Sequence, residues 1–375
     1  MVRFLHTADW QIGMKAVRTG KRANAVRQKR FDAADRIAKL AEEEDVDFVI
    51  LAGDTFEDHN VDDVAVKRTV DILNQLDPIP VYVLPGNHDP MIPGGIWDRD
   101  SWGRAGPHVT LLSERREYTH GDDVTLYACP LTQKQSSLDP TAWIPLREDD
   151  RIRIGIAHGA LDILPDRVNF PIAADRPEAS GLDYLALGDW HGYRVLGRAV
   201  YPGTMEPTGF GEKDPGNVLV VDIEEAHAEP LITTHPTGSL RWVDIEPGIS
   251  TLEDVEMFDR TLRDLEPLAS VLLKISPDVS GCTDSRALQR LETLRGEIEE
   301  RAFFLEWRDP VNQPIAGDGE NQIPDGMLYE IDGALAAILD GRIPEGPGHQ
   351  FADRDPEVIR AARLLLHRLA GGRSA

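Results

Sequence analysis

Four short runs in the first half of the chain consist almost entirely of Val, Ile and Leu, and each ends in glycine and polar residues. Such runs are typical of buried strands that lead into functional loops. Helical spacing of apolar residues at 31–44 and 64–76 indicates helices between them, so the pattern predicts α/β layering. The four runs are residues 46–54, 79–89, 151–159 and 182–192.

The pattern changes after about residue 246. Residues 270–275, 286–301 and 302–307 predict a strand, a helix and a strand that form one small unit. A polar segment rich in Pro and Gly follows at 309–326 and is typical of a linker.

Two amphipathic helices are predicted after the linker. In the first, Leu328, Ile331, Leu335 and Ile338 share one face. The second begins with Asp355 as N-cap and Pro356, and it ends at Gly371. Its predicted apolar stripe is Val358, Ala362, Leu365 and Leu369. We therefore expect domains at 1–246 and 247–315, with the linker and paired helices at 316–375.

Composition is that of a globular protein: 375 residues, 41% hydrophobic and 28% charged. No run of 18 apolar residues predicts a membrane span, and the N-terminus lacks the layout of a signal peptide. The two cysteines, Cys129 and Cys282, are far apart and lack metal-type spacing. We expect a cytoplasmic protein without disulfides and without membrane association.

The net charge of −25 argues against broad, sequence-independent binding to nucleic acid. The segment between Trp10 and Phe31 differs, because it contains seven basic residues and no acidic one. These residues form either a solvated helix face or an edge that contacts the phosphates of DNA. The candidates are Lys15, Arg18, Lys21, Arg22, Arg27, Lys29 and Arg30.

Polar groups that suit divalent metals follow each predicted strand. The sequence GNHD at 86–89 is the sharpest signal, because it places an amide, an imidazole and a carboxylate in consecutive order on a loop. Core packing does not explain five such loops, so the sequence predicts a metal site. The candidates are Asp9, Gln11, Asp54, Asn87, His88, Asp89, His158, Asp189 and His191.

The motifs FLHTADW, LAGDTF, PGNHD, AHG, LALGDWHG and YPGTMEPTGF occur in this order along the chain. They resemble the calcineurin-like metallophosphoesterases and, within them, the SbcD-type nuclease subunits. The resemblance implies a four-layer α/β/β/α sandwich with a small α+β capping domain and C-terminal helices.

The resemblance also implies a site with two divalent metal ions bridged by Asp54. One ion would be held by Asp9, Gln11 and His191, and the other by Asn87, His158 and Asp189. His88, backed by Asp89, would contact the scissile phosphate.

Two of these positions depart from the family pattern, which has histidine where this chain has Gln11 and Asp189. Both residues still offer oxygen to a cation, so we interpret the site as modified and not decayed. Oxygen ligands favour Mn²⁺, with Mg²⁺ as the second candidate, over Zn²⁺.

The function expected from these patterns is that of a Mn²⁺-supported DNA nuclease, both exonuclease and endonuclease, in DNA repair and recombination. Its implied partners are DNA and an SMC-like ATPase of the SbcC type, and a homodimer stays open. One alternative is a phosphatase or small-molecule phosphodiesterase, because a fold alone does not fix the substrate. Another is a catalytically weak scaffold subunit.

Two further features leave alternatives open. Trp97 and Trp102 lie on a loop after GNHD and either stack on bases or, as we favour, pack within the loop. The C-terminal helices either grip the coiled coil of the ATPase or pack on the capping domain.

Overall fold

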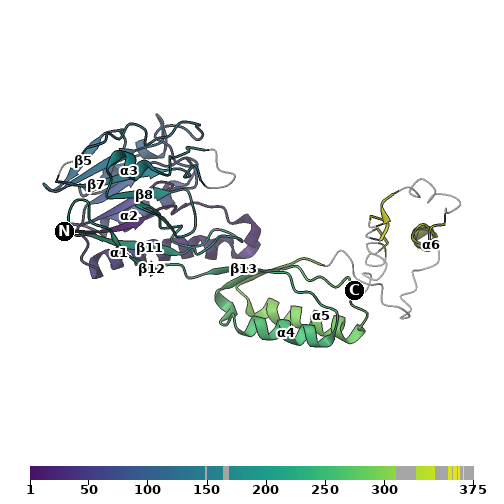
Figure 1. Cartoon of the computed structure of the whole chain (residues 1–375). Coiled ribbons are helices and arrows are strands. Elements are labelled where there is room, and N and C mark those ends of the chain that lie inside the picture. Colours follow the sequence, from purple (N-terminus) through teal and green to yellow (C-terminus); the bar gives the residue numbers. More distant parts are fainter. Residues whose placement is uncertain are drawn as a thin grey trace. The chain divides into compact units, whose positions relative to one another are not determined.

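The computed structural model describes residues 1–147, 150–163, 169–309 and 327–342, with scattered positions between 354 and 366. The chain forms two compact units, Met1–Trp242 and Val243–Ala375 (Figure 1). The division falls slightly before the predicted boundary at 246, because the strand β13 (Arg241–Ile245) joins the sheet of the second unit.

The first unit contains two six-stranded sheets. The first sheet has the order β12-β11-β1-β2-β3-β4, and β1 pairs in parallel with β2, as do β2 with β3 and β3 with β4. Its strands are β1 (Val2–Thr7), β2 (Phe48–Ala52), β3 (Val81–Leu84), β4 (Val109–Leu111), β11 (Asn217–Ile223) and β12 (Leu231–Pro236).

The second sheet has the order β5-β6-β7-β8-β10-β9, and the neighbours β6, β7 and β8 run parallel. Its strands are β5 (Glu117–His120), β6 (Val124–Cys129), β7 (Ile152–His158), β8 (Tyr184–Gly188), β9 (Arg194–Leu196) and β10 (Ala199–Tyr201).

The two sheets share an apolar core. Phe4, Phe48 and Ile50 of the first sheet cluster with Ile154 and Tyr184 of the second, and all five are fully buried. Burial on both faces explains why these strands read as continuous apolar runs in the sequence.

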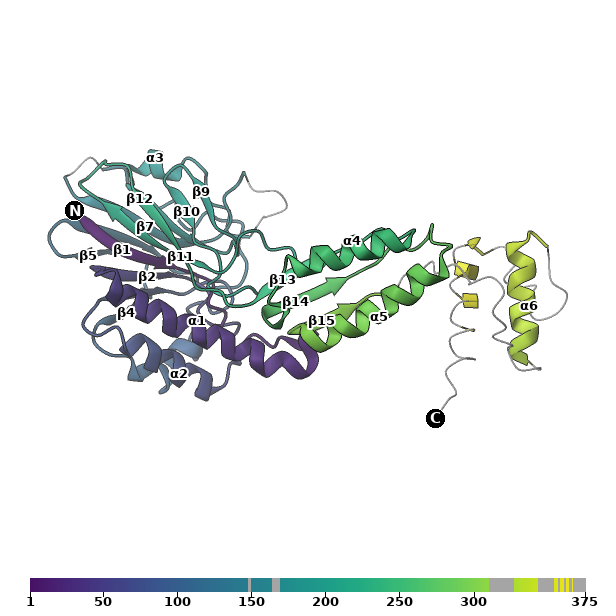
Figure 2. The same ribbon diagram turned by 90° about the horizontal axis from the view of Figure 1, so that it is seen from below.

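Helices cover the other face of the first sheet. These are α1 (Ala23–Glu43) and α2 (Asp63–Asn74), which lie side by side along it (Figure 2). The loops nearby include the 3₁₀ turns η1 (Val17–Arg22), η2 (Ile96–Asp98) and η3 (Trp102–Arg104).

The outer face of the second sheet carries a thinner layer. It consists of the short helix α3 (Arg176–Ser180) and irregular segments that pack around Ile144 and Trp143. The predicted four-layer sandwich is thus confirmed, with helices dominating one outer layer only.

The predicted helix at 31–44 belongs to a longer one, because α1 already begins at Ala23. Its basic first turns hid this start in the sequence. The second helix lies where it is expected, with Asp62 as N-cap accepting a hydrogen bond from the backbone N–H of Ala65.

The second unit contains a three-stranded sheet of β13, β14 (Val271–Ile275) and β15 (Phe304–Trp307). The helices α4 (Leu252–Arg263) and α5 (Ser285–Arg301) pack with it, and η4 (Leu268–Ser270) precedes β14. The strand–helix–strand prediction at 270–307 is confirmed, whereas α4 was not predicted.

The C-terminal region is described only in part. Residues 310–326 of the predicted linker lie outside the described residues, and the first predicted helix is α6 (Met327–Leu339). In the second predicted helix, Ile359 and Leu366 are buried whereas Val358 is 57% exposed, so the predicted stripe is out of phase by one residue. Leu365 and Leu369 of that stripe lie outside the described residues.

None of the helices in the described ranges is both long enough and apolar enough to cross a membrane.

Candidate metal centre

Five loops bring the candidate ligands together at the carboxyl ends of the central strands. Asp9 follows β1, Asp54 follows β2 and Asn87 follows β3 in the first sheet. His158 ends β7 and Asp189 follows β8 in the second sheet. Because these parallel strands all end at the same edge, residues far apart in the sequence become neighbours.

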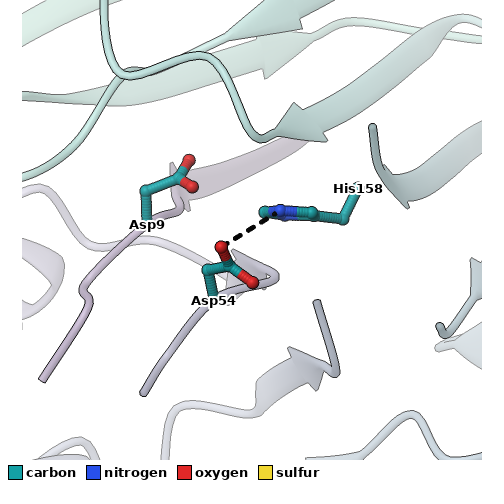
Figure 3. Close-up of side chains that lie close together, drawn as sticks. All are labelled: Asp9, Asp54 and His158. Atoms are coloured by element: carbon teal, nitrogen blue, oxygen red, sulfur yellow. Dashed lines mark ion pairs between the residues drawn. The ribbon is translucent and has the colours of Figure 1, made fainter. Parts of the chain in front are cut away.

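The centre of this cluster is formed by Asp9, Asp54 and His158, whose side chains point toward one another in Figure 3. Their ligand atoms all lie within 4.8 Å of one another, and all three residues are buried. His158 Nε2 lies 3.4 Å from Asp54 Oδ2. A buried group of two carboxylates and an imidazole at this spacing can hold a divalent cation.

The backbone of these loops is unusual. Asp9, Asp54 and Asp189 adopt positive φ angles of 52°, 51° and 101°. Non-glycine residues rarely adopt this region, and such strain is concentrated at functional sites. Gly53 and Gly86 make the close approach possible, because a Cβ on either would lie 2.2 Å from His158 Nδ1 or Asp54 Oδ1, respectively.

His158 is oriented by the backbone of β2. Its Nδ1 lies 2.9 Å from the carbonyl oxygen of Ala52, so Nδ1–H is the donor and Nε2 is left to bind a cation. The same Nε2 lies 2.9 Å from Asn87 Oδ1, which places the predicted ligand Asn87 beside it.

His88 lies at the exposed side of the cluster, with 41% of its side chain accessible. Its backbone N–H donates to Asp54 Oδ1 at 2.9 Å, and its Nε2 lies 4.0 Å from Asp54 Oδ2. Its Nδ1 lies 2.8 Å from the carbonyl oxygen of Glu57. Because Nδ1 is occupied by this carbonyl, Nε2 is the ring atom available to a substrate.

Asp89 does not back His88, contrary to the sequence-based expectation. Its carboxylate is fully buried and accepts hydrogen bonds from the backbone N–H groups of Phe56 at 2.9 Å and Gly86 at 2.7 Å. The partner of His88 is the backbone carbonyl of Glu57. Asp89 therefore ties the β2 and β3 loops together and is not a catalytic residue in this arrangement.

The other predicted ligands gather around His191. Gln11 Nε2 lies 3.0 Å from His191 Nε2, and a half-turn of the amide would place the carbonyl oxygen of Gln11 there instead. His191 Nε2 lies 4.0 Å from Asp9 Oδ1. The backbone N–H of Asp189 donates to the Asp9 carboxylate, at 3.3 and 3.1 Å from its two oxygens. The structure thus brings Gln11, His191 and Asp189 to the Asp9 side of the cluster.

The side chain of Glu212 contacts the far side of His191, and no sequence pattern indicated it. Its Oε1 lies 2.8 Å from His191 Nδ1. The two residues are 21 positions apart and lie on different loops, so no local motif links them.

The electrostatics of the centre suit a cation. Burial raises the pKa of Asp9 to about 6, and the charges of Asp54 and Asp189 add to the rise. Burial opposes it, but the charge and hydrogen bond of Asp54 raise the pKa of His158 well above its ordinary value. Crowded, buried carboxylates of this kind are stabilised by a divalent cation, so the residues present fit one.

Arg30 does not belong to a DNA-contacting edge, because its side chain is buried in the core and only 1% of the residue is exposed. It donates to the carbonyl oxygens of Asp9, Trp10 and Glu206 at 2.7–3.1 Å and to Thr204 Oγ1 at 2.9 Å. Burial lowers its pKa to about 10, so it remains charged at neutral pH. Arg30 therefore fixes the backbone of the Asp9 loop from behind.

The remaining basic residues lie near the surface in two groups. Lys15, Arg18, Lys21 and Arg22 are exposed, whereas Arg27 and Lys29 are half-buried. Lys29 lies 3.7 Å from Asp32 in an ion pair on α1.

The two tryptophans after GNHD pack in the core, which agrees with the favoured interpretation. Trp97 and Trp102 are 5% and 6% exposed, with ring centroids 4.7 Å apart in an edge-to-face contact. Both contact the ring of Phe56. They anchor the loop and are not accessible to bases.

One protein family accounts for this combination of fold and loops. The family model described as calcineurin-like phosphoesterase matches residues 2–195, just over half of the chain. The chain belongs to this family. It is therefore a metallophosphoesterase by family, and such proteins hydrolyse phosphoesters with divalent metal ions.

The chain is also similar to three curated proteins. It is 27% identical over 208 residues to the uncharacterized metallophosphoesterase YhaO of Bacillus subtilis, which covers 52% of this chain and 50% of that protein. It is 24% identical over 312 residues to the DNA double-strand break repair protein Mre11 of Methanosarcina mazei, which covers 79% and 49%. It is 31% identical over 91 residues to one component of the nuclease SbcCD of Bacillus subtilis, which covers 24% and 22%. The chain spans about half the length of the first two of these relatives.

Metal binding by this metallophosphoesterase should release protons at neutral pH. The raised pKa of His158 means that Nε2 carries a proton in the metal-free protein, next to Asp54, and a cation must displace it. The apparent affinity for Mn²⁺ should therefore rise between pH 6 and 7.5, and it should fall further below pH 6 as Asp9 also protonates. Calorimetric titration with Mn²⁺ in buffers of different ionisation enthalpy measures the release. A titration without proton release at pH 7 would contradict the assignment of His158 as a ligand.

Proposed function

We propose that this protein is a metal-dependent nuclease that hydrolyses phosphodiester bonds in DNA, like the SbcD-type proteins. The observation that carries the proposal is the convergence of Asp9, Asp54 and His158, with the partly exposed His88 beside them. The names of two relatives, a repair protein and a component of a nuclease, support DNA as the substrate class.

The chain's own residues suit this chemistry. When bound, two divalent cations supply charge neutralisation and activation of water at the phosphodiester. Asp54 lies between the two groups of ligands and would contact both cations, while the oxygen donors of Asp9, Asn87 and Gln11 favour Mn²⁺ or Mg²⁺. His88 Nε2 is held at the exposed side, where it would hold or deliver a proton to the leaving oxygen.

A basic groove supports a polyanionic substrate. The groove has a volume of about 690 Å³ and begins beside Ile12 and Gly13, directly after Gln11. Lys15, Arg27 and Arg68 line it together with polar side chains of α1 and α2. Arg68 lies over the ring of Phe31 at 4.0 Å, and its guanidinium donates to Gln28 at 2.7 Å, so its charge is held in place at the groove.

The proposal is tested with the purified protein in Mn²⁺ on linear duplex DNA, single-stranded DNA and bis-p-nitrophenyl phosphate. We expect cleavage of DNA and of the small diester. Hydrolysis of the small ester together with intact DNA would identify a small-molecule phosphodiesterase or phosphatase instead. Metal-dependent cleavage of none of them would leave only a scaffold role.

The groove provides a second, independent test. The double variant Lys15→Glu with Arg68→Glu should weaken DNA binding by about tenfold or more and flatten its dependence on salt, because phosphate contacts are lost. Hydrolysis of bis-p-nitrophenyl phosphate should stay unchanged. The control is Lys39→Glu with Lys67→Glu, which reverses two exposed lysines on the same helices outside the groove. Equal effects of both pairs on DNA binding would remove the groove from the proposal.

We also propose an SMC-like ATPase of the SbcC type as the partner, as in the complex after which one relative is named. The C-terminal helices are the proposed docking element. Arg363 pairs with Asp332 of α6 at 2.7 and 3.1 Å, so the two helical segments contact each other. Deletion of residues 326–375 should abolish capture of the ATPase and preserve hydrolysis of the small diester. An insoluble or metal-free truncated protein would instead place these helices in the core.

A further inference from the structure

The two imidazoles of the metal centre are held by chemically different partners. Nδ1 of His158 lies 2.9 Å from a neutral backbone carbonyl, that of Ala52. Nδ1 of His191 lies 2.8 Å from Oε1 of Glu212, which is a carboxylate. Both partners leave Nε2 for a cation, but only Glu212 brings a negative charge to the ring.

Glu212 is held in place by its own loop. The backbone N–H of Thr208 donates to Oε2 at 2.9 Å, and the Thr208 hydroxyl contacts Oε1. The side chain is 13% exposed, and the preceding Gly211 has a φ of +87°. The carboxylate is therefore ordered beside His191 and does not swing in solvent.

This arrangement lies on the side of the centre where the ligand is weakest. Gln11 Nε2 lies 3.0 Å from His191 Nε2, so the two side chains meet at one place. The amide of Gln11 offers only a neutral carbonyl oxygen, which is a weaker donor than an imidazole. A carboxylate bonded to Nδ1 makes an imidazole a stronger donor at Nε2.

We propose that Glu212 is a positioning residue that strengthens His191 as a metal ligand and so offsets the weak ligand Gln11 at the same ion. The inference rests on the two-metal site of the proposed function and is independent of DNA as its substrate. The side of the centre with His158 and Asn87 has no share in this effect.

The test measures Mn²⁺ binding without substrate, by electron paramagnetic resonance titration of the full-length protein. Glu212→Gln keeps the shape of the side chain and removes its charge. It should lower the affinity of one of the two Mn²⁺ ions by about 10–100-fold, as is typical for such outer partners. Gln11→Ala should weaken the same ion, whereas Asn87→Ala should weaken the other. Gln11→His in the Glu212→Gln background should restore the affinity.

Three results would overturn the proposal: unchanged binding in Glu212→Gln, equal weakening of both ions, or no rescue by Gln11→His. Thermal unfolding of the metal-free proteins separates a folding defect from a loss of affinity. If Glu212→Gln does not fold, Thr208→Val provides the second variant, because it removes only the hydroxyl that contacts the carboxylate. It should give a smaller decrease at the same ion, and an unchanged titration would again overturn the proposal. Because no DNA is present, the result is independent of whether the protein is a nuclease.

Discussion

Replacing Asp54 by asparagine should abolish tight binding of both metal ions and reduce phosphodiester hydrolysis by about 10⁴-fold or more. Asp54 lies at the centre of the site. Its carboxylate is 3.4 Å from His158 Nε2, accepts the backbone N–H of His88 at 2.9 Å and lies in one cluster with Asp9. Asparagine keeps the shape but loses the charge that two cations would share. The measurement combines Mn²⁺ titration with hydrolysis of bis-p-nitrophenyl phosphate.

Asp58→Asn is the matched control, because Asp58 lies on the same loop and bonds only locally to the backbone N–H of Asn60 among its described contacts. It should behave like the unaltered protein in both measurements. Circular dichroism of the metal-free Asp54→Asn protein checks that the fold is retained. A folded variant that still binds two Mn²⁺ ions would show that Asp54 does not bridge them.

His88→Ala should separate metal binding from catalysis. Its side chain reaches the exposed side of the site, and its ring is oriented by the carbonyl of Glu57, so its Nε2 faces the place where a substrate would bind. Mn²⁺ affinity should stay near that of the unaltered protein. Cleavage of DNA should fall by about 10²–10⁴-fold, which is the usual contribution of a general acid or base.

The control is His235→Ala on β12, which removes an imidazole from a strand at the edge of the first sheet. A smaller loss with bis-p-nitrophenyl phosphate than with DNA would support a role at the leaving oxygen, because p-nitrophenolate needs little protonation. Cleavage of DNA at the unaltered rate by His88→Ala, with both ions bound, would exclude His88 from the mechanism.

The positions of the ligands were predictable from the sequence because burial determines where the strands lie. A strand that is apolar on both sides must lie in the middle of the sandwich, and the polar residues after it must then emerge at its edge. Asp54, Asn87 and His158 follow this rule, and the structure brings them within contact of one another. The departures at Gln11 and Asp189 did not disturb it, because both residues keep the strand-end position.

The errors arose where the chain changes direction or phase. Arg30 lay within a basic stretch, but α1 begins early enough to place it on the same face as the buried Val26 and Ile37. Consecutive loop residues point in different directions, so Asp89 turns away from His88 although it follows directly in GNHD. Helix α4 was missed although Thr251 and Asp254 form a capping box at its start.

Glu212 shows what no local pattern can reveal. It lies on the loop between β10 and β11 and reaches His191 only because β8 and β10 are neighbours in the sheet. A contact of this kind depends on the tertiary fold.

The central claim is that this buried cluster binds two divalent ions that enable phosphodiester hydrolysis. The most direct test is to count the Mn²⁺ ions bound per chain and to measure hydrolysis of bis-p-nitrophenyl phosphate in the same samples. We predict two bound ions, no hydrolysis in the metal-free protein, and a rate that rises as the second, weaker ion binds. Fewer than two ions at saturating Mn²⁺, or hydrolysis that persists after the metal has been removed, would contradict the account.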